Sequence, residues 1–346
     1  MIEINGSEGE GGGAILRVAT SLSAVTGKPV RVNNIRKGRS QPGLKTQHLE
    51  SIRVLAQICN AQLKGDKLGS TEIEFIPGKI ESKNIQAKIE TAGSPGLLFQ
   101  NIKIPASLGE KETVISVKGG AICGLGAPPI PYLQNVTLPI LEKFGYRASI
   151  KTNKYGFFPK GGADVEFLIE TWKEKKNLIL LEQGKIEEIS GISIASKHLE
   201  NAKVSERQAK SATGWLENKF SVKTNIESKY VDASNPGSVI VLWIKTSTGC
   251  ILGSDAIGEL KVRAEDVGKK AANQLIEDFE NGSTIDMRLS DQILPFLALA
   301  KGKSEFIASE LTKHAETNIW VIKKFLDVDF KIDCLERGVK ISCSGC

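Results

Sequence analysis

Long hydrophobic runs are missing from this sequence. Its longest apolar stretches, Ile293 to Ala300 and Val239 to Ile244, are too short to cross a bilayer as helices. The first residues, Met1 to Asn5, also lack the basic and apolar regions of a secretory signal. We therefore expect a cytoplasmic protein that has no membrane as a partner.

Cysteine pairs with metal-binding spacing are equally scarce. The chain has six cysteines, but only Cys343 and Cys346 form a CxxC pair, and a structural zinc site needs four ligands. The pattern therefore does not predict a zinc site. The role of the C-terminal pair stays open, because a disulfide there is compatible with a hyperthermophilic source.

Charge of either sign is not concentrated enough to define a partner. The 346 residues are 40% hydrophobic and 25% charged, which is ordinary for a globular protein and allows about two domains. A net charge of +6 permits a polyanionic partner without requiring one.

Histidine is rare, which draws attention to the segment around His314. The chain has three histidines, and this one follows a short apolar strand pattern, Phe306 to Ala308, and precedes a helical pattern that ends at Phe325. We expect His314 in the strand-to-helix loop or the first helical turn, where helix amides can hold an anion. A neutral imidazole is nucleophilic near neutral pH. The alternative is a solvated or capping histidine.

Two further segments have the composition of phosphate sites. Glycines around Glu10 open a helix that carries Arg17 one turn later, so the backbone can approach a ligand and Glu10 can hold a divalent cation. A loop with Arg36, Arg39 and Gln47 is rich in cations, as phosphate or RNA backbone contacts require. The alternative for the glycine-rich segment is a flexible turn, and the alternative for the second segment is a solvated basic loop. His48, at the end of that loop, is interpreted as a capping or packing residue.

A third segment contains Asp291 and Gln292 at a predicted helix start. Asp291 could cap that helix, hold an imidazole tautomer or bind a ribose. The glycine-rich loop that ends at Pro128 and Pro129 could form an apolar wall for a base.

The predicted elements recur along the chain. Their order is β-α-β-α-β-β over residues 1–76 and again over residues 85–169. A third copy is predicted from a strand over Ser283 to Met287, a helix over Ser290 to Ala300, and the elements around His314. This recurrence predicts an α/β (α+β) protein in which three βαβαββ units form a large domain.

Residues 180–282 do not follow that order. They read as strand, helix, two strands and helix, with the helices at Val204 to Phe220 and Ala264 to Phe279. We predict a smaller α/β domain inserted at 180–282, so that the large domain comprises residues 1–179 and 283–346.

Several ordered motifs resemble the RNA 3'-terminal phosphate cyclase family over nearly the whole chain. The segment from Glu10 to Arg17 resembles the family's opening EGGGQILR, and Tyr155 to Gly162 is similar to its (R/H)GxxPxGGG signature. The other matching segments are Arg36 to Leu44, Gln47 to Leu49, Lys261 to Gly268, Leu289 to Gln292 and His314 to Asn318. The sequence departs from the pattern at Tyr155, where the family has a basic residue, at Ala163, where it has a glycine, and at Arg288, where relatives often have an aromatic residue or histidine.

The resemblance implies a ligase that uses ATP. ATP adenylates a histidine, AMP passes to an RNA 3'-phosphate, and the vicinal 2'-hydroxyl attacks to give a 2',3'-cyclic phosphate and AMP. The implied partner is RNA with a 3'-phosphate end, the implied cofactors are ATP and Mg or Mn, and a homodimer is compatible with the sequence.

The resemblance also implies residue roles. His314 would be the nucleophile and Glu10 would help to hold the metal. The residues expected at ATP are Gln100, Arg288, Leu289, Ser290, Asp291, Gln292, Arg17 and Pro128. The residues expected at substrate phosphates are Arg36, Arg39 and Gln47, together with Arg17.

Three alternatives remain at this level. One branch of the family lacks the histidine and serves as a non-catalytic RNA-binding protein in ribosome assembly, and His314 argues against it. An enolpyruvyl-type transferase on the related fold would not depend on His314. A general nucleic-acid-binding protein would show steep salt dependence without ATP turnover.

Overall fold

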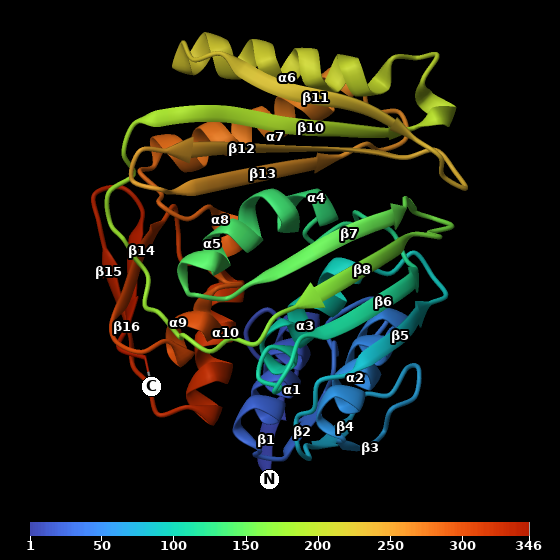
Figure 1. The fold of residues 1–346 in the computed structure, drawn as a ribbon, viewed down its shortest axis with the longest axis vertical. Helices are drawn as coiled ribbons and strands as arrows, with labels where there is room; N and C mark the ends of the chain where they lie inside the picture. The colour runs from blue at the N-terminus through green and yellow to red at the C-terminus, as the bar shows by residue number, and fades with distance from the viewer. Residues whose placement is uncertain (346) are drawn as a thin grey trace.

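The computed structural model describes residues 1–345 and joins α-helices to four small sheets (Figure 1). Each sheet has four strands within this range. Cys346 lies outside the described residues, so the proposed Cys343–Cys346 pair has no structural account.

The N-terminal residues form the first sheet and two helices. The sheet order is β1-β2-β4-β3, with β1 and β2 parallel and the other neighbours antiparallel. The elements are β1 (Ile2–Asn5), α1 (Gly13–Thr26), β2 (Val30–Asn33), α2 (Thr46–Cys59), β3 (Gln62–Lys64) and β4 (Ile73–Ile76).

The next residues form a second sheet, β5-β6-β8-β7, with the same pattern of one parallel and two antiparallel pairings. The predicted helix from Tyr132 to Phe144 is divided by a π turn, next to Pro139, which has no N–H to donate. The elements are β5 (Asn84–Ile89), α3 (Pro95–Ala106), β6 (Thr113–Gly119), α4 (Ile130–Tyr132), η1 (Leu133–Thr137), α5 (Leu138–Lys143), β7 (Ala148–Lys154) and β8 (Asp164–Ile169).

The third sheet joins strands from both sides of the middle region. Its order is β15-β16-β14-β9, and β9 is parallel to β14. Its strands and associated helices are β9 (Ile179–Leu180), α8 (Met287–Ser290), α9 (Leu294–Leu299), β14 (Ser304–Ala308), α10 (Lys313–Phe325), β15 (Phe330–Cys334) and β16 (Val339–Cys343).

The middle region forms the fourth sheet, β11-β10-β12-β13, with two long helices on one face (Figure 1). Apolar residues of these helices and strands form a core separate from that of the other three sheets. The elements are β10 (Ile186–Ser196), η2 (Lys197–Leu199), α6 (Val204–Phe220), β11 (Thr224–Val231), β12 (Ser238–Thr246), β13 (Ile251–Ile257) and α7 (Ala264–Glu280).

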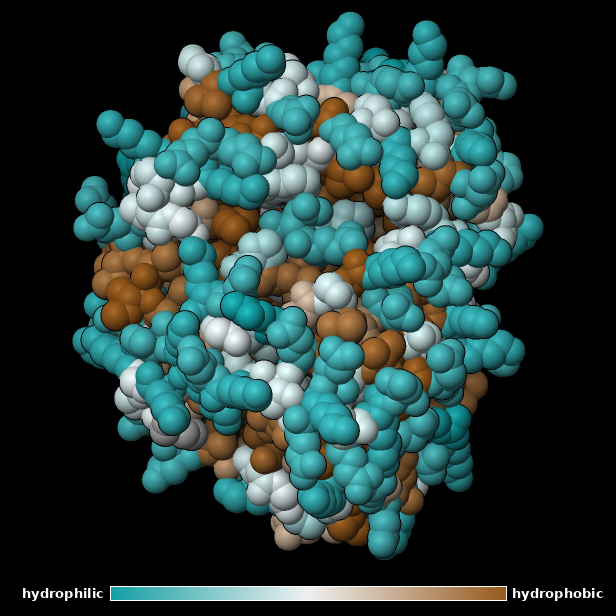
Figure 2. Space-filling model, in the orientation of Figure 1, coloured by the Kyte–Doolittle hydropathy of each residue, from teal (hydrophilic) through white to brown (hydrophobic). Residues whose placement is uncertain are grey.

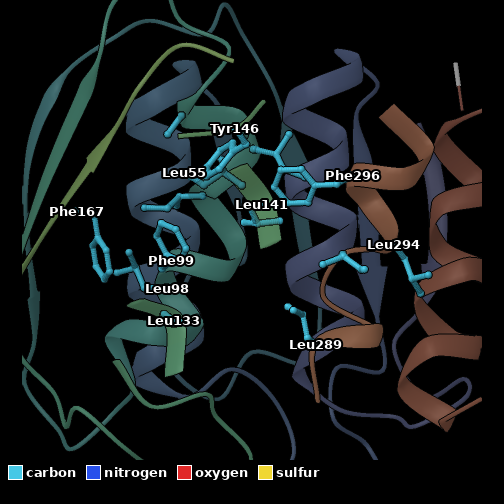
Figure 3. Close-up of a cluster of buried hydrophobic side chains, with 14 of the residues drawn as sticks. Leu55, Leu98, Phe99, Leu133, Leu141, Tyr146, Phe167, Leu289, Leu294 and Phe296 are labelled. Atoms are coloured by element: carbon cyan, nitrogen blue, oxygen red, sulfur yellow. The ribbon is translucent and has the colours of Figure 1, made fainter. Parts of the chain in front are cut away.

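The main core lies where the helices associated with the first three sheets meet. Figure 3 shows Leu55 of α2, Phe99 of α3 and Phe296 of α9 among its side chains. Phe99 stacks on Phe167 with ring centroids 5.1 Å apart, and Phe296 meets the edge of Tyr146 at 5.2 Å. Burial of these large rings supplies much of the driving force for folding here.

The structure corrects three element predictions. Residues 283–287 are not a strand, because Asp286 instead caps α8 and accepts hydrogen bonds from the amides of Arg288 and Leu289. The predicted helix from Ser290 to Ala300 is shorter, because Ser290 is the last residue of α8 and the next helix, α9, begins only at Leu294, with Pro295 in its first turn. The sequence prediction also lacked β13.

In residues 1–345, no helix is both long and apolar enough to cross a membrane. Hydrophilic side chains predominate on the face seen in Figure 2, with apolar residues in smaller areas between them.

Candidate active site

His314 lies in the first turn of α10, within the range predicted from the sequence. The helix begins there because the Thr312 hydroxyl accepts a hydrogen bond from the Ala315 amide, at 3.0 Å. The His314 side chain is 52% exposed, so a ligand can reach it. Its Nε2 lies 4.0 Å from Oε2 of Glu10.

Glu10 sits in the glycine-rich turn before α1. Its amide donates to Oγ1 of Thr317 on α10, at 3.1 Å, so the two helix N-termini are tied together. Gly9 permits this approach, because it has φ +54° and a Cβ there would lie 2.1 Å from Thr317 Oγ1.

The Glu10 carboxylate is almost fully buried, with 5% of the side chain exposed. Oε2 accepts from Nη2 of Arg39 at 2.8 Å. Oε1 is buried and has no hydrogen-bond partner among the described residues. A buried carboxylate oxygen left in this state is a suitable ligand for a hard divalent cation.

Glu10 is not part of a larger group of metal-ligand side chains in the described chain. Residues 1–345 contain no cluster of three or more His, Cys, Asp or Glu side chains that could hold a metal ion. A cation at Glu10 would complete its coordination with substrate phosphate oxygens and water, as Mg²⁺ commonly does.

The two loop arginines have different environments. Arg36 is buried, and its Nη1 donates to the carbonyls of Gln41 and Gly43 at 2.7 and 2.9 Å, so it holds the shape of the loop. Burial lowers the pKa of Arg36, and the nearby positive charge of Arg39 lowers it further. Arg39 is 49% exposed and faces Glu10, where it is free to meet a ligand.

Gln47 and His48 open α2 close to the same turn. Oε1 of Gln47 accepts from the Ser94 amide at 3.2 Å, which leaves its amide nitrogen available. His48 is buried, and its Nδ1 accepts from the Lys45 amide at 3.2 Å. Burial lowers the pKa of His48 to about 3, so the ring is neutral, and the interpretation as a capping or packing residue is confirmed.

Four residues predicted at ATP line one pocket between α1, α3 and α9. These are Arg17, Gln100, Asp291 and Gln292. Burial raises the pKa of Asp291 to about 6, opposed chiefly by the nearby His314 and Arg17. Asp291 ends α8, whereas the N-cap of that helix is Asp286.

Lys103 and Asn318 belong to this pocket but were not predicted as site residues. Nζ of Lys103 donates to the Gln292 carbonyl at 3.1 Å, and burial lowers the pKa of Lys103 to about 7. Nδ2 of Asn318 donates to the Asp291 carbonyl at 3.0 Å. Oε1 of Gln292 and Oδ1 of Asn318 are buried without a hydrogen-bond partner in the described chain, which suits a polar ligand or water.

The other four residues that were predicted to contact ATP do not line that pocket. Arg288 contacts Asp255 of β13, with Nε and Oδ1 3.1 Å apart. Leu289 and Ser290 are fully buried, and the Ser290 hydroxyl donates to the Met287 carbonyl, so their side chains serve packing. Pro128 is buried beside Gly96, where α3 begins.

The missed residues differ in how far the sequence signalled them. Thr317 and Asn318 lie in the motif that starts at His314, so the sequence alone could have indicated them as site residues. Lys103 lies in an apolar helix pattern, and Asp255 lies in a segment for which no strand was predicted, so only the fold places Lys103 in the pocket and Asp255 beside Arg288.

Known proteins resemble this chain along nearly its whole length. The family model described as "RNA 3'-terminal phosphate cyclase" matches residues 8–332. A protein of that name from Thermococcus gammatolerans is 44% identical over 332 residues, which cover 96% of this chain and 94% of the relative. One from Methanosarcina barkeri is 41% identical and covers 99% of this chain and 100% of the relative. The chain therefore belongs to the RNA 3'-terminal phosphate cyclase family.

Proposed function

We propose that the protein converts the 3'-terminal phosphate of RNA to a 2',3'-cyclic phosphate, with ATP consumed to AMP and pyrophosphate, through a histidyl-AMP intermediate on His314. The observation that carries this proposal is the arrangement of the exposed His314 ring 4.0 Å from the buried carboxylate of Glu10. A nucleophile, an anionic metal ligand and the cation Arg39 thereby meet at two helix N-termini.

In the first step, a neutral imidazole nitrogen of His314 attacks the α-phosphorus of ATP. The new N–P bond replaces the bond to the pyrophosphate, which leaves. Arg17, Arg39 and the amides that open α10 neutralise the charge that develops on the phosphate oxygens. Because little acid-base work is needed, positioning and charge neutralisation account for most of the rate.

The nucleotide would occupy the pocket beside this histidine. Gln100, Asp291 and Gln292 line it and offer polar groups to the ribose and base. Arg288, Leu289, Ser290 and Pro128 lie outside this lining, so they would act on the nucleotide only indirectly, by holding the neighbouring backbone in place. The unpartnered oxygens of Gln292 and Asn318 support a polar ligand at this point.

The residues present fit a divalent cation, either Mg or Mn. Glu10 would hold it through Oε1, the buried oxygen that lacks a partner among the described residues. When bound, the cation neutralises phosphate charge.

The RNA phosphate would approach from the basic loop. The half-exposed Arg39 and the amide nitrogen of Gln47 would hold it, and Arg36 would act mainly by fixing the loop. An oxygen of the RNA phosphate attacks the phosphorus of the histidyl adenylate and releases His314. The RNA 2'-hydroxyl then attacks the adjacent 3'-phosphorus and expels AMP as its proton leaves.

The fold class and domain division are part of the same proposal. The shared strand order of three sheets supports three βαβαββ units in one large domain, and the separate core of the middle region supports an inserted domain at 180–282. Leu180 is the exception at the boundary, because it pairs in the third sheet. A cytoplasmic location and a homodimer stay predictions.

The test is the reaction itself. RNA with a labelled 3'-phosphate is incubated with ATP, Mg²⁺ or Mn²⁺ and the wild type or His314→Ala. The proposal predicts a phosphatase-resistant cyclic end and equimolar AMP with the wild type, and neither product with the variant. RNA binding by a folded wild type that forms no cyclic end would contradict it and favour the non-catalytic alternative.

A further inference from the structure

Phe158 is exposed in a way that its packing does not require. It lies in the turn 155–163 between β7 and β8, and it is 74% exposed, while the preceding Phe157 is 2% exposed. Lys160, two residues later, is also exposed. An exposed aromatic ring next to a cation is the usual composition of a surface that binds single-stranded nucleic acid.

The turn is held in place, so the exposure of Phe158 does not come from a loose loop. Nδ2 of Asn235 donates to the Phe158 carbonyl at 2.7 Å, and the Gly161 amide donates to the Phe157 carbonyl at 2.7 Å. Figure 1 shows the connection between β7 and β8 near that between β11 and β12, which contains Asn235. The ring of Phe158 is therefore presented from a fixed backbone.

A second cation lies at the start of the turn. Nζ of Lys229, on β11, lies 3.2 Å from the Tyr155 hydroxyl and 5.3 Å from the centre of its ring. Tyr155 stands where the family signature has a basic residue. Lys229 brings a positive charge back to this position from the middle region.

The turn also lies close to the proposed RNA phosphate site. A Cβ on Gly161 would lie 2.8 Å from the Gly120 carbonyl and 3.1 Å from that of Thr91. Thr91 belongs to the short turn whose Ser94 amide hydrogen-bonds to Gln47. The 155–163 turn therefore approaches the turn that contacts Gln47, and an RNA strand that leaves the site in this direction would pass over Phe158.

We propose that the turn 155–163 binds the nucleotides upstream of the RNA 3' end, with a base stacked on Phe158 and backbone phosphates near Lys160 and Lys229. The proposal rests on the proposed function for the direction of the strand. It assigns a binding role to a segment that takes no part in the chemistry at His314.

Binding without ATP provides the test. The dissociation constants of a labelled 3'-phosphorylated decanucleotide and of a 3'-phosphorylated dinucleotide are measured for the wild type, Phe158→Ala and Phe158→Trp. Stacking predicts that Phe158→Ala weakens decanucleotide binding roughly tenfold and leaves dinucleotide binding unchanged. Phe158→Trp should bind the decanucleotide like the wild type. Trp215→Ala, at another exposed aromatic residue, is the control and should have no effect.

Salt dependence tests the cation separately. Lys160→Ser should reduce the slope of log affinity against log salt concentration by about one for the decanucleotide. Unchanged decanucleotide affinity in Phe158→Ala, or equal weakening for both lengths, would overturn the proposal. ATP-dependent adenylation of the same variants is measured in parallel, so a protein that binds RNA through Phe158 but never adenylates would refute the proposed function alone.

Discussion

Arg288 and Asp255 form an ion pair across the two cores of the molecule, with Nε and Oδ1 3.1 Å apart. Asp255 lies on β13 in the middle region, and its side chain is only 4% exposed. Burial raises the pKa of Asp255 to about 6, while Arg288 opposes that rise. The middle region thereby fixes the arginine that opens the proposed nucleotide segment.

Asp255→Asn should weaken the use of ATP. The amide keeps the size of the side chain but loses the charge that orients Arg288, so we expect the KM for ATP in adenylation to rise roughly tenfold. Asp232→Asn, on an 86% exposed side chain of the same region, is the matched control and should not change KM. An unchanged KM in Asp255→Asn would show that Arg288 does not depend on this pair.

Glu10→Gln should impair adenylation through the loss of its charge. The amide can still accept from Arg39, but it is a poor ligand for Mg²⁺. We expect adenylation to slow roughly 100-fold and half-maximal activity to need more Mg²⁺. Glu8→Gln, which alters an exposed acid in the same turn, should behave as wild type. Equal Mg²⁺ dependence in Glu10→Gln and wild type would rule out the proposed ligand role.

Thr317→Val should loosen the contact between the two helix N-termini. The hydroxyl accepts from the Glu10 amide at 3.1 Å and donates to the Lys313 carbonyl at 2.6 Å, and valine removes both bonds. We expect a loss of about 1 kcal/mol in the free energy of unfolding and a roughly tenfold slower adenylation. Thr317→Ser retains the hydroxyl and should restore both values. If serine and valine act alike, the hydroxyl is not what joins the helices.

Asp278 should make stability depend on pH. Burial and, to a smaller extent, the charge of Asp286 raise its pKa from 3.8 to about 7. The folded state therefore holds the proton more tightly than the unfolded state. The stability from this group is fully present below pH 3.8 and is lost as the pH rises through about 7.

Asp278→Asn removes this titration and keeps the oxygen that accepts from Ser309. Its free energy of unfolding, measured with urea, should match that of the wild type at pH 4 and exceed it at pH 8 by on the order of 2 kcal/mol. Asp266→Asn, on the exposed face of the same helix, should show no such gain. An equal difference at both pH values would contradict the assignment.

Strongly periodic segments could be predicted well from the sequence. The helix from Val204 to Phe220 matches the structure at both ends, and His314 lies in the first helical turn, one of the two positions predicted for it. In contrast, β13 contains Gly253, Ser254 and Asp255, residues that are depleted in strands or usually exposed. Tertiary contacts decide its structure, because Ser254 hydrogen-bonds to the Ala271 carbonyl and Asp255 pairs with Arg288.

The candidate site shows the same division between local and tertiary information. Motifs identified Glu10, Arg39 and His314, since each lies in a loop or helix start with unusual composition. They could not reveal that Arg36 bonds to its own loop, because this depends on the conformation of the loop. They also could not reveal that Leu289 is buried in the core, because this depends on how distant segments pack. Lys103 could not be predicted as a site residue for the same reason, because it is a buried cation in an otherwise apolar helix.

Label transfer to the protein tests the central claim most directly. The wild type and His314→Ala are incubated with α-labelled ATP and Mg²⁺ or Mn²⁺ without RNA, then denatured, and the labelled peptide is identified by mass spectrometry. We predict an acid-labile, alkali-stable adenylate on His314 that disappears when RNA with a 3'-phosphate is added, and no label on the variant. A folded wild type that binds ATP but takes up no label, or equal label on both proteins, would contradict His314 as the nucleophile.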